Sequence, residues 1–340
     1  MCDDATTAVQ SVTEGFSPLD RQLGLTDSVY SPGMMKDMVW LGGLVTYDQT
    51  VQVLERIGHR SVPRTSVWRE NQTHGERMKT FLEREQERVK PERIVLPPPG
   101  QDHKRAIGIS MDGGMVNIKG EGWKEIKVGA VFDVGKGEEE DPITGEWVTQ
   151  AIGVNVEYAA VLGPVQDFGP ALWRLAVERE VPQAARTSVT ADGAGWIWNV
   201  AADYFPDSEQ IVDWYHACEH LAQASTALYP EEEKRSERWF KEQQTNLFLG
   251  NIHTITDPLD QHDLKDQSRY FHTHKRRMRY QEFREEGYPI GSGTVESGIK
   301  RFKSRLTGAG MRWSRQGAER MLVVRGAVMA DTFDEMWEAA

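Results

Sequence analysis

Apolar runs with the character of β-strands occupy the middle of the chain. In Ile126–Val134, for example, Val128, Ala130 and Phe132 alternate with outward-facing positions, which is the period of a half-buried strand. Strands are predicted at Ala106–Met111, Ile126–Val134, Gln150–Val161, Thr187–Ala191 and Gln210–Trp214. Helices are predicted over about Gly169–Glu180, directly after Asp192, and over Tyr215–Leu228. This order predicts an α/β fold in which helices pack on a mixed sheet.

Helical periodicity dominates the residues before these strands. Helices are predicted at about Met34–Leu41, Tyr47–Ile57 and Pro63–Glu87. The Gly42–Gly43 pair would end the first helix, Thr46 is a suitable N-cap for the second, and Pro63 suits the first position of the third. Residues 1–30 are expected to be disordered or loop-like, because they lack a sustained periodicity.

The polar face of the third predicted helix has two interpretations. It carries side chains of the kinds that read base edges in the major groove, namely Arg64, Arg69, Asn71 and Gln72. Two short helices, a tight turn and such a helix are typical of a helix-turn-helix DNA-binding domain. A helical hairpin with a polar outer face would show the same composition, so the pattern alone leaves both interpretations open.

Changes in composition divide the chain into segments. A charged and then proline-rich stretch, which contains Leu96-Pro-Pro-Pro-Gly, is typical of a stiff linker. Between Tyr229 and Gly287 the pattern is charged and helical, which indicates an α-helical insertion in the sheet domain. The predicted organisation is a loop-like N-terminus (1–30), a helical domain (31–90), a linker (91–104), the first part of the α/β core (105–228), the insertion (229–287) and the C-terminal helices of the core (288–338).

Composition and charge argue against several classes of protein. The 340 residues include two cysteines that lie far apart, so a disulfide framework is not expected and a reducing cytosol suits the chain. The polar, acidic start is unlike a signal peptide, and no apolar run approaches the length of a membrane span. The formal net charge of −12 opposes DNA binding, but fourteen Lys or Arg stand against five Glu between Arg269 and Arg325. Phosphate contact depends on the local field, so this basic region is consistent with a nucleic-acid enzyme.

Three acidic residues occupy positions that are typical of reactive groups. Asp112 and Asp192 each follow an apolar strand and precede glycines, and Glu296 lies just inside the start of a predicted helix. Ligands bind to α/β sheets at the carboxyl ends of strands, although an Asp-Gly pair is also a simple turn signal. Two aspartates and a helical glutamate would suit two divalent cations, which take oxygen ligands.

Five short segments along the chain carry a resemblance to a known family. They are Met111-Asp-Gly-Gly-Met-Val, Gly122-Trp-Lys-Glu-Ile-Lys-Val-Gly, Ala191-Asp-Gly-Ala-Gly-Trp-Ile-Trp-Asn, Asp213-Trp-Tyr-His216 and Gly291-Ser-Gly-Thr-Val-Glu-Ser. In this order they resemble the DDE transposases of bacterial insertion sequences, in the branch related to the Mutator-like superfamily. The resemblance extends roughly from Gly15 to Trp337, and it is specific because five separate segments agree.

The resemblance implies an RNase H-like core with an α-helical insertion, in which Asp112, Asp192 and Glu296 form the DDE triad. It implies two Mg²⁺ ions, with Mn²⁺ as a substitute, for cleavage of the element ends and strand transfer into target DNA. The implied partners are the terminal inverted repeats of the element and target DNA, bound by a homodimer or larger oligomer at the nucleoid in the bacterial cytoplasm, with no membrane involved. A metal-dependent nuclease without strand transfer and a non-catalytic, DNA-binding transposase remnant are the alternatives.

Further side chains are predicted near this triad. By the same resemblance, His216 lies near the active site, where it contacts the scissile phosphate or orients a carboxylate; a capping Asp213 with a buried structural histidine is the alternative. Cations on the Glu296 helix are predicted to contact the DNA backbone, with a solvated charged face as the alternative. These cations are Lys300, Arg301, Lys303 and Arg305.

Two other groups of residues invite a functional interpretation. The aromatic side chains of Trp196, Trp198, Trp214 and Tyr215 could stack on a flipped base, but a place in the core is the more common role at helical spacing. A zinc site in the segment from His216 to His220 is not expected, because it offers at most three ligands and a helix would not direct them to one point.

Overall fold

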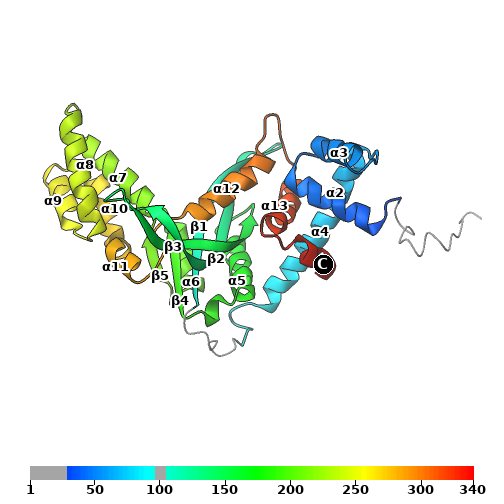
Figure 1. Ribbon diagram of the computed structural model, residues 1–340, viewed down its shortest axis with the longest axis horizontal. Helices are drawn as coiled ribbons and strands as arrows, with labels where there is room; N and C mark the ends of the chain where they lie inside the picture. Colours follow the sequence, from blue (N-terminus) through cyan, green and yellow to red (C-terminus); the bar gives the residue numbers. More distant parts are fainter. Residues whose placement is uncertain (1–28, 96–104) are drawn as a thin grey trace, which may run out of the picture.

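The computed structural model describes residues 29–95 and 105–340 as a mixed α/β fold around one five-stranded sheet (Figure 1). The strands are β1 (Ala106–Ile118), β2 (Gly122–Glu140), β3 (Trp147–Val161), β4 (Arg186–Ala191) and β5 (Glu209–Val212), in the order β3-β2-β1-β4-β5. The first three strands pair in antiparallel fashion, and β4 and β5 run parallel to β1. The predicted mixed sheet with packed helices is confirmed. Most of the predicted N-terminal segment (1–28) and of the linker (96–104) lies outside the described residues.

Helices cover both faces of the sheet because successive strand residues point to opposite sides. On one face, Ile107 and Ile109 join a core with Phe168 of α5 and Ile197 of α6. On the other face, Val128 and other alternate residues join a core with helices α12 and α13. These helices are α5 (Val165–Glu178), α6 (Gly195–Tyr204), α12 (Gly293–Leu306) and α13 (Arg315–Met329). The alternation predicted from the sequence therefore determines which residues enter each core.

Strand β1 continues beyond the point at which the sequence predicted its end. Asp112 pairs with Val128 of β2, and the two following glycines stay in the strand instead of forming a turn. Neighbours crowd these glycines, since a Cβ on Gly113 would lie 2.6 Å from the Glu125 carboxylate. The parallel partner β4 does end here, because its last pair joins Ala191 to Met111. Asp112 and Asp192 are therefore adjacent where the parallel pairing stops.

The N-terminal helices are α2 (Pro32–Leu44), α3 (Tyr47–Arg56) and α4 (Arg64–Arg88). The prediction that Gly42 and Gly43 end the first helix is wrong, because α2 continues through both. They permit close packing instead: a Cβ on Gly42 would lie 2.4 Å from the side chain of Asn71, and one on Gly43 would lie 3.0 Å from Val324. The predicted cap of the second helix is confirmed, since Thr46 accepts a hydrogen bond from the backbone of Gln49 at 3.2 Å.

Two buried arginines, here called the arginine joint, connect these helices to the sheet domain. Arg305 of α12 donates from Nε to the Gly42 carbonyl at 2.7 Å, and its guanidinium lies over the rings of Tyr47 and Trp313. Arg325 of α13 donates to the Gly43 carbonyl at 3.0 Å. Helices α2 and α4 also pack on α13, and their apolar side chains share a core with the sheet. The predicted helical domain (31–90) is therefore packed into the α/β core.

The remaining helices form the predicted insertion and the C-terminus. The insertion follows α7 (Trp214–Leu228) and contains α8 (Glu233–Phe248), α9 (His253–Gln261), α10 (Lys265–His274) and α11 (Tyr280–Glu285), and the chain ends with α14 (Phe333–Ala339), which was not predicted. In Figure 1 the insertion and the N-terminal helices lie at opposite ends of the molecule, and α12 runs from the sheet toward α2 and α3. Within the described ranges, no helix has the length and apolar character needed to cross a membrane.

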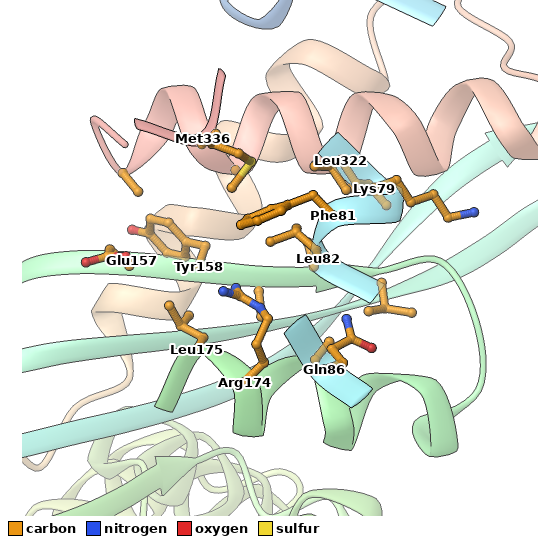
Figure 2. A pocket seen from close by; sticks show the side chains of 18 of the residues that line it. Lys79, Phe81, Leu82, Gln86, Glu157, Tyr158, Arg174, Leu175, Leu322 and Met336 are labelled. Atoms are coloured by element: carbon orange, nitrogen blue, oxygen red, sulfur yellow. The ribbon is translucent and has the colours of Figure 1, made fainter. Parts of the chain in front are cut away.

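A cavity of about 340 Å³ opens along the outer edge of β3. Figure 2 shows Phe81 and Leu82 of α4 between the side chains of α13 above and those of α5 below, with Met336 of α14 at one end. Its lining mixes apolar side chains with carboxylates such as Glu157 and Glu178. None of Asp112, Asp192 and Glu296 lines this cavity, so the candidate chemistry lies elsewhere.

The arginine joint predicts a specific loss of stability. We expect Arg305→Lys to lower the free energy of unfolding by about 2 kcal/mol, because an ammonium keeps the charge but loses the Nε bond and the planar contact with the two rings. Urea denaturation measures the change. Lys303→Ala, an exposed cation on the same helix, is the control and should change stability by less than about 0.5 kcal/mol. Equal effects of the two substitutions would contradict a stabilising role of the arginine joint.

Candidate functional site

Two aspartates meet at the end of the parallel strands. The half-buried Asp112 accepts a hydrogen bond at Oδ1 from the backbone N–H of Gly113 at 2.6 Å. Asp192 follows β4, and its Oδ1 accepts from the N–H of Ala194 at 2.9 Å, which closes the turn into α6. Gly193 in that turn has a φ of +105°, a conformation that L side chains rarely adopt. The turn thus fixes where the Asp192 carboxylate emerges from the sheet.

A third aspartate, Asp213, connects the start of α7 to the start of α12. It is the N-cap of α7 and its exposed fraction is 0 %. Its Oδ1 accepts from the backbone N–H of His216 at 2.7 Å and lies 3.1 Å from the His216 Nδ1. Its Oδ2 accepts from the N–H of Ser292 at 2.5 Å. Both carboxylate oxygens are thus occupied by the protein, which makes Asp213 a residue that orients its neighbours.

Glu296 reaches the same place from the first turn of α12. Its Oε1 accepts from the Ser292 hydroxyl at 3.2 Å, and Lys300 Nζ lies 3.9 Å from Oε2. Asp213, His216 and Glu296 each offer a ligand atom within 4.8 Å of the others, so this group could hold a metal ion. Of the three, Asp213 already accepts hydrogen bonds at both oxygens and His216 directs Nδ1 to Asp213, so Glu296 is the predicted carboxylate that this group brings in.

The pKa values of the site show that its charges interact. Burial, together with the negative charges of Asp192 and Glu296, raises the pKa of Asp112 to about 6 against the opposing effects of Gly113 and His216. The hydrogen bond to Asp213 raises the pKa of His216 to about 9. Burial would raise the pKa of Asp213, but the bonds from His216 and Ser292 outweigh it and lower that pKa. The charges of Asp192 and Glu296 thus act on Asp112, and these three carboxylates are here called the carboxylate cluster.

The structure brings the predicted site residues together in two subsets: Asp112 and Asp192 at the end of the β1–β4 pairing, and His216 and Glu296 beside Asp213. Among the described residues, the ligand atoms that lie within 4.8 Å of one another belong to Asp213, His216 and Glu296, and not to the three predicted carboxylates together. Sequence reasoning missed Ser292 as a partner of Glu296. The signal for it was a serine four residues before the acid, at the start of a helix, where a side chain is within reach of the next turn. Asp213 has features of both predicted interpretations of its segment, because it caps α7 and also orients the half-exposed His216.

The predicted DNA contacts on α4 differ in accessibility. Arg64 and Arg69 are exposed, and Gln72 is half-buried, with its Oε1 accepting from Arg320 at 3.0 Å. Asn71 is only 1 % exposed and donates to the carbonyls of Met38 and Val67, so its predicted role in reading DNA is corrected to one in helix packing.

The cations of α12 divide in the same way. Lys300, Arg301 and Lys303 are exposed, although Arg301 also donates to the Met329 carbonyl at 3.3 Å. Arg305 is only 3 % exposed and belongs to the arginine joint. Its predicted contact with the DNA backbone is therefore corrected, because the guanidinium faces the interior and not the solvent.

The aromatic group and the lone cysteine of α7 are mostly structural. Trp198 and Trp214 are buried and Trp196 packs against Phe168, which matches the predicted core role. Tyr215 is the exception, with 58 % of its surface exposed beside His216. Burial raises the pKa of the Cys218 thiol to about 12, so it stays protonated and is a poor metal ligand.

Comparison with known protein families and with curated proteins finds no match for this chain. The resemblance carried by the five sequence segments therefore depends on those residues alone. Within the described part of the chain, the carboxylate cluster combines elements that are remote in sequence: the middle of β1, the turn after β4 and the first turn of α12. It also lies outside the cavity of Figure 2.

The Asp213–His216 pair predicts how stability depends on pH. Because the folded state raises the pKa of His216 from 6.5 to about 9, the pair stabilises the protein fully below pH 6.5, and this stabilisation is lost as the pH rises through about 9. We expect the difference in unfolding free energy between the wild type and His216→Gln to shrink across that range. Urea denaturation in a metal chelator measures it, and a constant difference would contradict the ion pair.

Proposed function

We propose that this chain is a DDE transposase that cleaves the ends of a DNA element and joins them to target DNA. The observation that carries the proposal is the carboxylate cluster: Asp112 and Asp192 lie on adjacent strands, and Glu296 belongs to the group with Asp213 and His216 that could hold a metal ion. The pKa of Asp112, which is raised first by burial and then by the charges of Asp192 and Glu296, supports it. Such a site is suited to divalent cations and, through them, to phosphodiester chemistry.

An RNase H-like core is part of the proposal. The strand order β3-β2-β1-β4-β5, with three antiparallel strands followed by two parallel ones, supports this assignment. So does the position of Asp112 on the central strand, with Asp192 at the end of its neighbour. We also propose that α2, α3 and α4 form a helix-turn-helix unit whose exposed Arg64 and Arg69 contact DNA.

The carboxylate cluster has the donor chemistry for two Mg²⁺ ions, with Mn²⁺ as a substitute. Asp112, Asp192 and Glu296 provide only oxygen ligands, which hard cations prefer. These residues would hold such ions, which would supply activation of the attacking oxygen and neutralisation of the charge on the leaving oxygen. The Ser292 hydroxyl, 3.2 Å from Glu296, holds that carboxylate in one orientation, as outer partners of metal ligands do.

His216 would supply a positive charge beside the carboxylate cluster. The bond to the buried Asp213 keeps its imidazole protonated near neutral pH and directs Nδ1 inward. The ring is still partly exposed, with 34 % of the side chain accessible. The opposite ring nitrogen can therefore donate a hydrogen bond to a phosphate oxygen of bound DNA.

The proposed substrate is DNA, and exposed cations on α12 are consistent with binding its phosphate backbone. Lys300 and Lys303 follow Glu296 on α12 and are exposed, so a phosphate backbone that passes the carboxylate cluster can meet them. The proposed partners are the terminal repeats of the element and target DNA, held by a homodimer or larger oligomer. A nuclease without strand transfer would use the same carboxylates, whereas a non-catalytic remnant would not need all three.

The carboxylates can be tested by substitution. We expect Asp112→Asn, Asp192→Asn and Glu296→Gln each to reduce Mg²⁺-dependent cleavage of the flanking DNA at least about a hundredfold, because several kcal/mol of transition-state stabilisation depend on the ions held there. Glu138→Gln, an exposed carboxylate on β2, is the matched control. Circular dichroism verifies the fold of each variant. Full cleavage by the three folded variants would reject the site.

The products of the same assay separate the alternatives. Wild type with a donor plasmid should give joined donor–target DNA, as expected of a transposase. Nicked DNA without joined products would indicate a nuclease, and DNA binding without any cleavage would indicate a remnant.

The basic surface of α12 predicts the salt dependence of DNA binding. Replacing both Lys300 and Lys303 with Ala should weaken binding for all sequences and reduce the slope of log affinity against log salt by about two, one for each lost phosphate contact. Fluorescence anisotropy across a range of KCl concentrations measures the slope. Lys265→Ala, an exposed cation on α10 of the insertion, is the control. An unchanged slope in the double variant would show that Lys300 and Lys303 of α12 do not contact DNA phosphates.

A further inference from the structure

The helical insertion touches the carboxylate cluster through one tyrosine. Tyr270 lies on α10, far along the chain from the strands, yet its hydroxyl donates to the backbone carbonyl of Asp192 at 3.3 Å. Burial and the nearby Asp192 charge raise the pKa of Tyr270, so the hydroxyl keeps its proton for this bond. The contact thus joins the insertion to the residue that ends β4.

The turn after Asp192 is shaped to receive this side chain. A Cβ on Gly193 would lie 3.2 Å from Cε2 of Tyr270 and 3.3 Å from Nε2 of His274, so a larger residue would force them apart. Gly193 also has a φ of +105°, which a side chain would strain. Two independent constraints therefore require a glycine where α10 meets the turn.

Tyr270 is itself held in place by neighbouring rings. The ring of His220 on α7 stacks on it with 3.6 Å between centroids and 22° between planes. The ring of His274 meets it edge-on at 5.0 Å. Farther along, Arg277 donates to the Gln210 side chain on β5 at 2.9 Å and lies over the ring of Trp198. The insertion is thus fixed to the ends of β4 and β5, and Tyr270 cannot shift independently.

We infer that Tyr270 is a positioning residue, through which the insertion fixes the Asp192 carboxylate for binding a divalent cation. Asp192 itself has one hydrogen bond to its carboxylate, from Ala194 within the same turn. Metal ligands must be held to within about 0.5 Å of their working geometry, and a short turn closed by a single bond needs support from outside. This inference rests on the proposed function, and it assigns to the insertion a direct part in the site.

Metal affinity without DNA tests the inference independently of activity. Mn²⁺ binding to the full chain would be measured by isothermal titration calorimetry for the wild type, Tyr270→Phe and the control Tyr204→Phe. Tyr270→Phe keeps the ring and its stacking but loses the hydroxyl, so we expect about fivefold weaker binding with an unchanged melting temperature, from the loss of one hydrogen bond. Tyr204 is a half-buried tyrosine of α6 whose ring lies tilted beside that of Trp173, and Tyr204→Phe should bind Mn²⁺ like the wild type.

A double-mutant comparison shows whether Tyr270 acts through Asp192. In an Asp192→Asn background, Tyr270→Phe should cause no further loss of Mn²⁺ affinity, because the carboxylate that it positions is already gone. A further loss of the same fivefold size would mean that Tyr270 acts by another route and would overturn the inference.

The outcomes also separate this inference from the proposed function. If Asp192→Asn weakens Mn²⁺ binding but Tyr270→Phe does not, the positioning role is rejected and the metal site stands. If the wild type binds no Mn²⁺, or Asp192→Asn binds it as well as the wild type does, both fail. Gly193→Ala disturbs the same contact from the side of the turn, so it should also weaken Mn²⁺ binding. A Mn²⁺ affinity equal to that of the wild type would contradict the positioning role of Tyr270.

Discussion

The buried carboxylate of Asp213 is the interaction on which the arrangement of the site depends. Its backbone N–H donates to the Ala191 carbonyl at the end of β4 at 2.7 Å, while its side chain accepts from α7 and α12. A buried carboxylate without such donors carries a large desolvation cost. The ends of β4, β5, α7 and α12 are therefore constrained to meet at one point. Asp213 thereby joins the elements that carry Asp192 and Glu296.

Local pattern was sufficient for much of the fold. The alternation of Val128, Ala130 and Phe132 correctly indicated a strand, but the prediction that the positions between them face outward was wrong, because both faces of the strand are buried there. The Thr46 cap depends on side chains three residues apart. The position at which β1 ends could not be predicted from the local sequence pattern. Asp112 and its glycines are equally compatible with a turn, and only the pairing with β2 keeps them extended. Pairing over that range is a tertiary property.

The site residues show the same limit. Asp192, His216 and Glu296 could be selected because they lie just after a strand or in the first turn of a helix, which are local features. Asp112 was selected as a strand end although it lies within β1. Arg305 and Asn71 were wrongly predicted to face DNA, although their helical spacing indicated burial. Arg305 lies three residues after Phe302 on the buried face of α12, and Asn71 lies four residues after Val67 on the buried face of α4. The contact between Tyr270 and Asp192 had no signal, because it depends on how the insertion docks.

The arginine joint has a consequence for how the N-terminal helices can move relative to α12. Arg305 and Arg325 bind the carbonyls at the end of α2, and within the described residues neither has a carboxylate partner that could hold it elsewhere. Pulling α2 away would remove the Gly42 acceptor of the buried Arg305 and the Gly43 acceptor of Arg325, which is costly even though Arg325 also donates to the Arg301 carbonyl. Helices α2 and α4 must then move together with α12, the helix that carries Glu296. Under the proposed function, DNA bound at α4 would therefore lie at a fixed distance from Glu296.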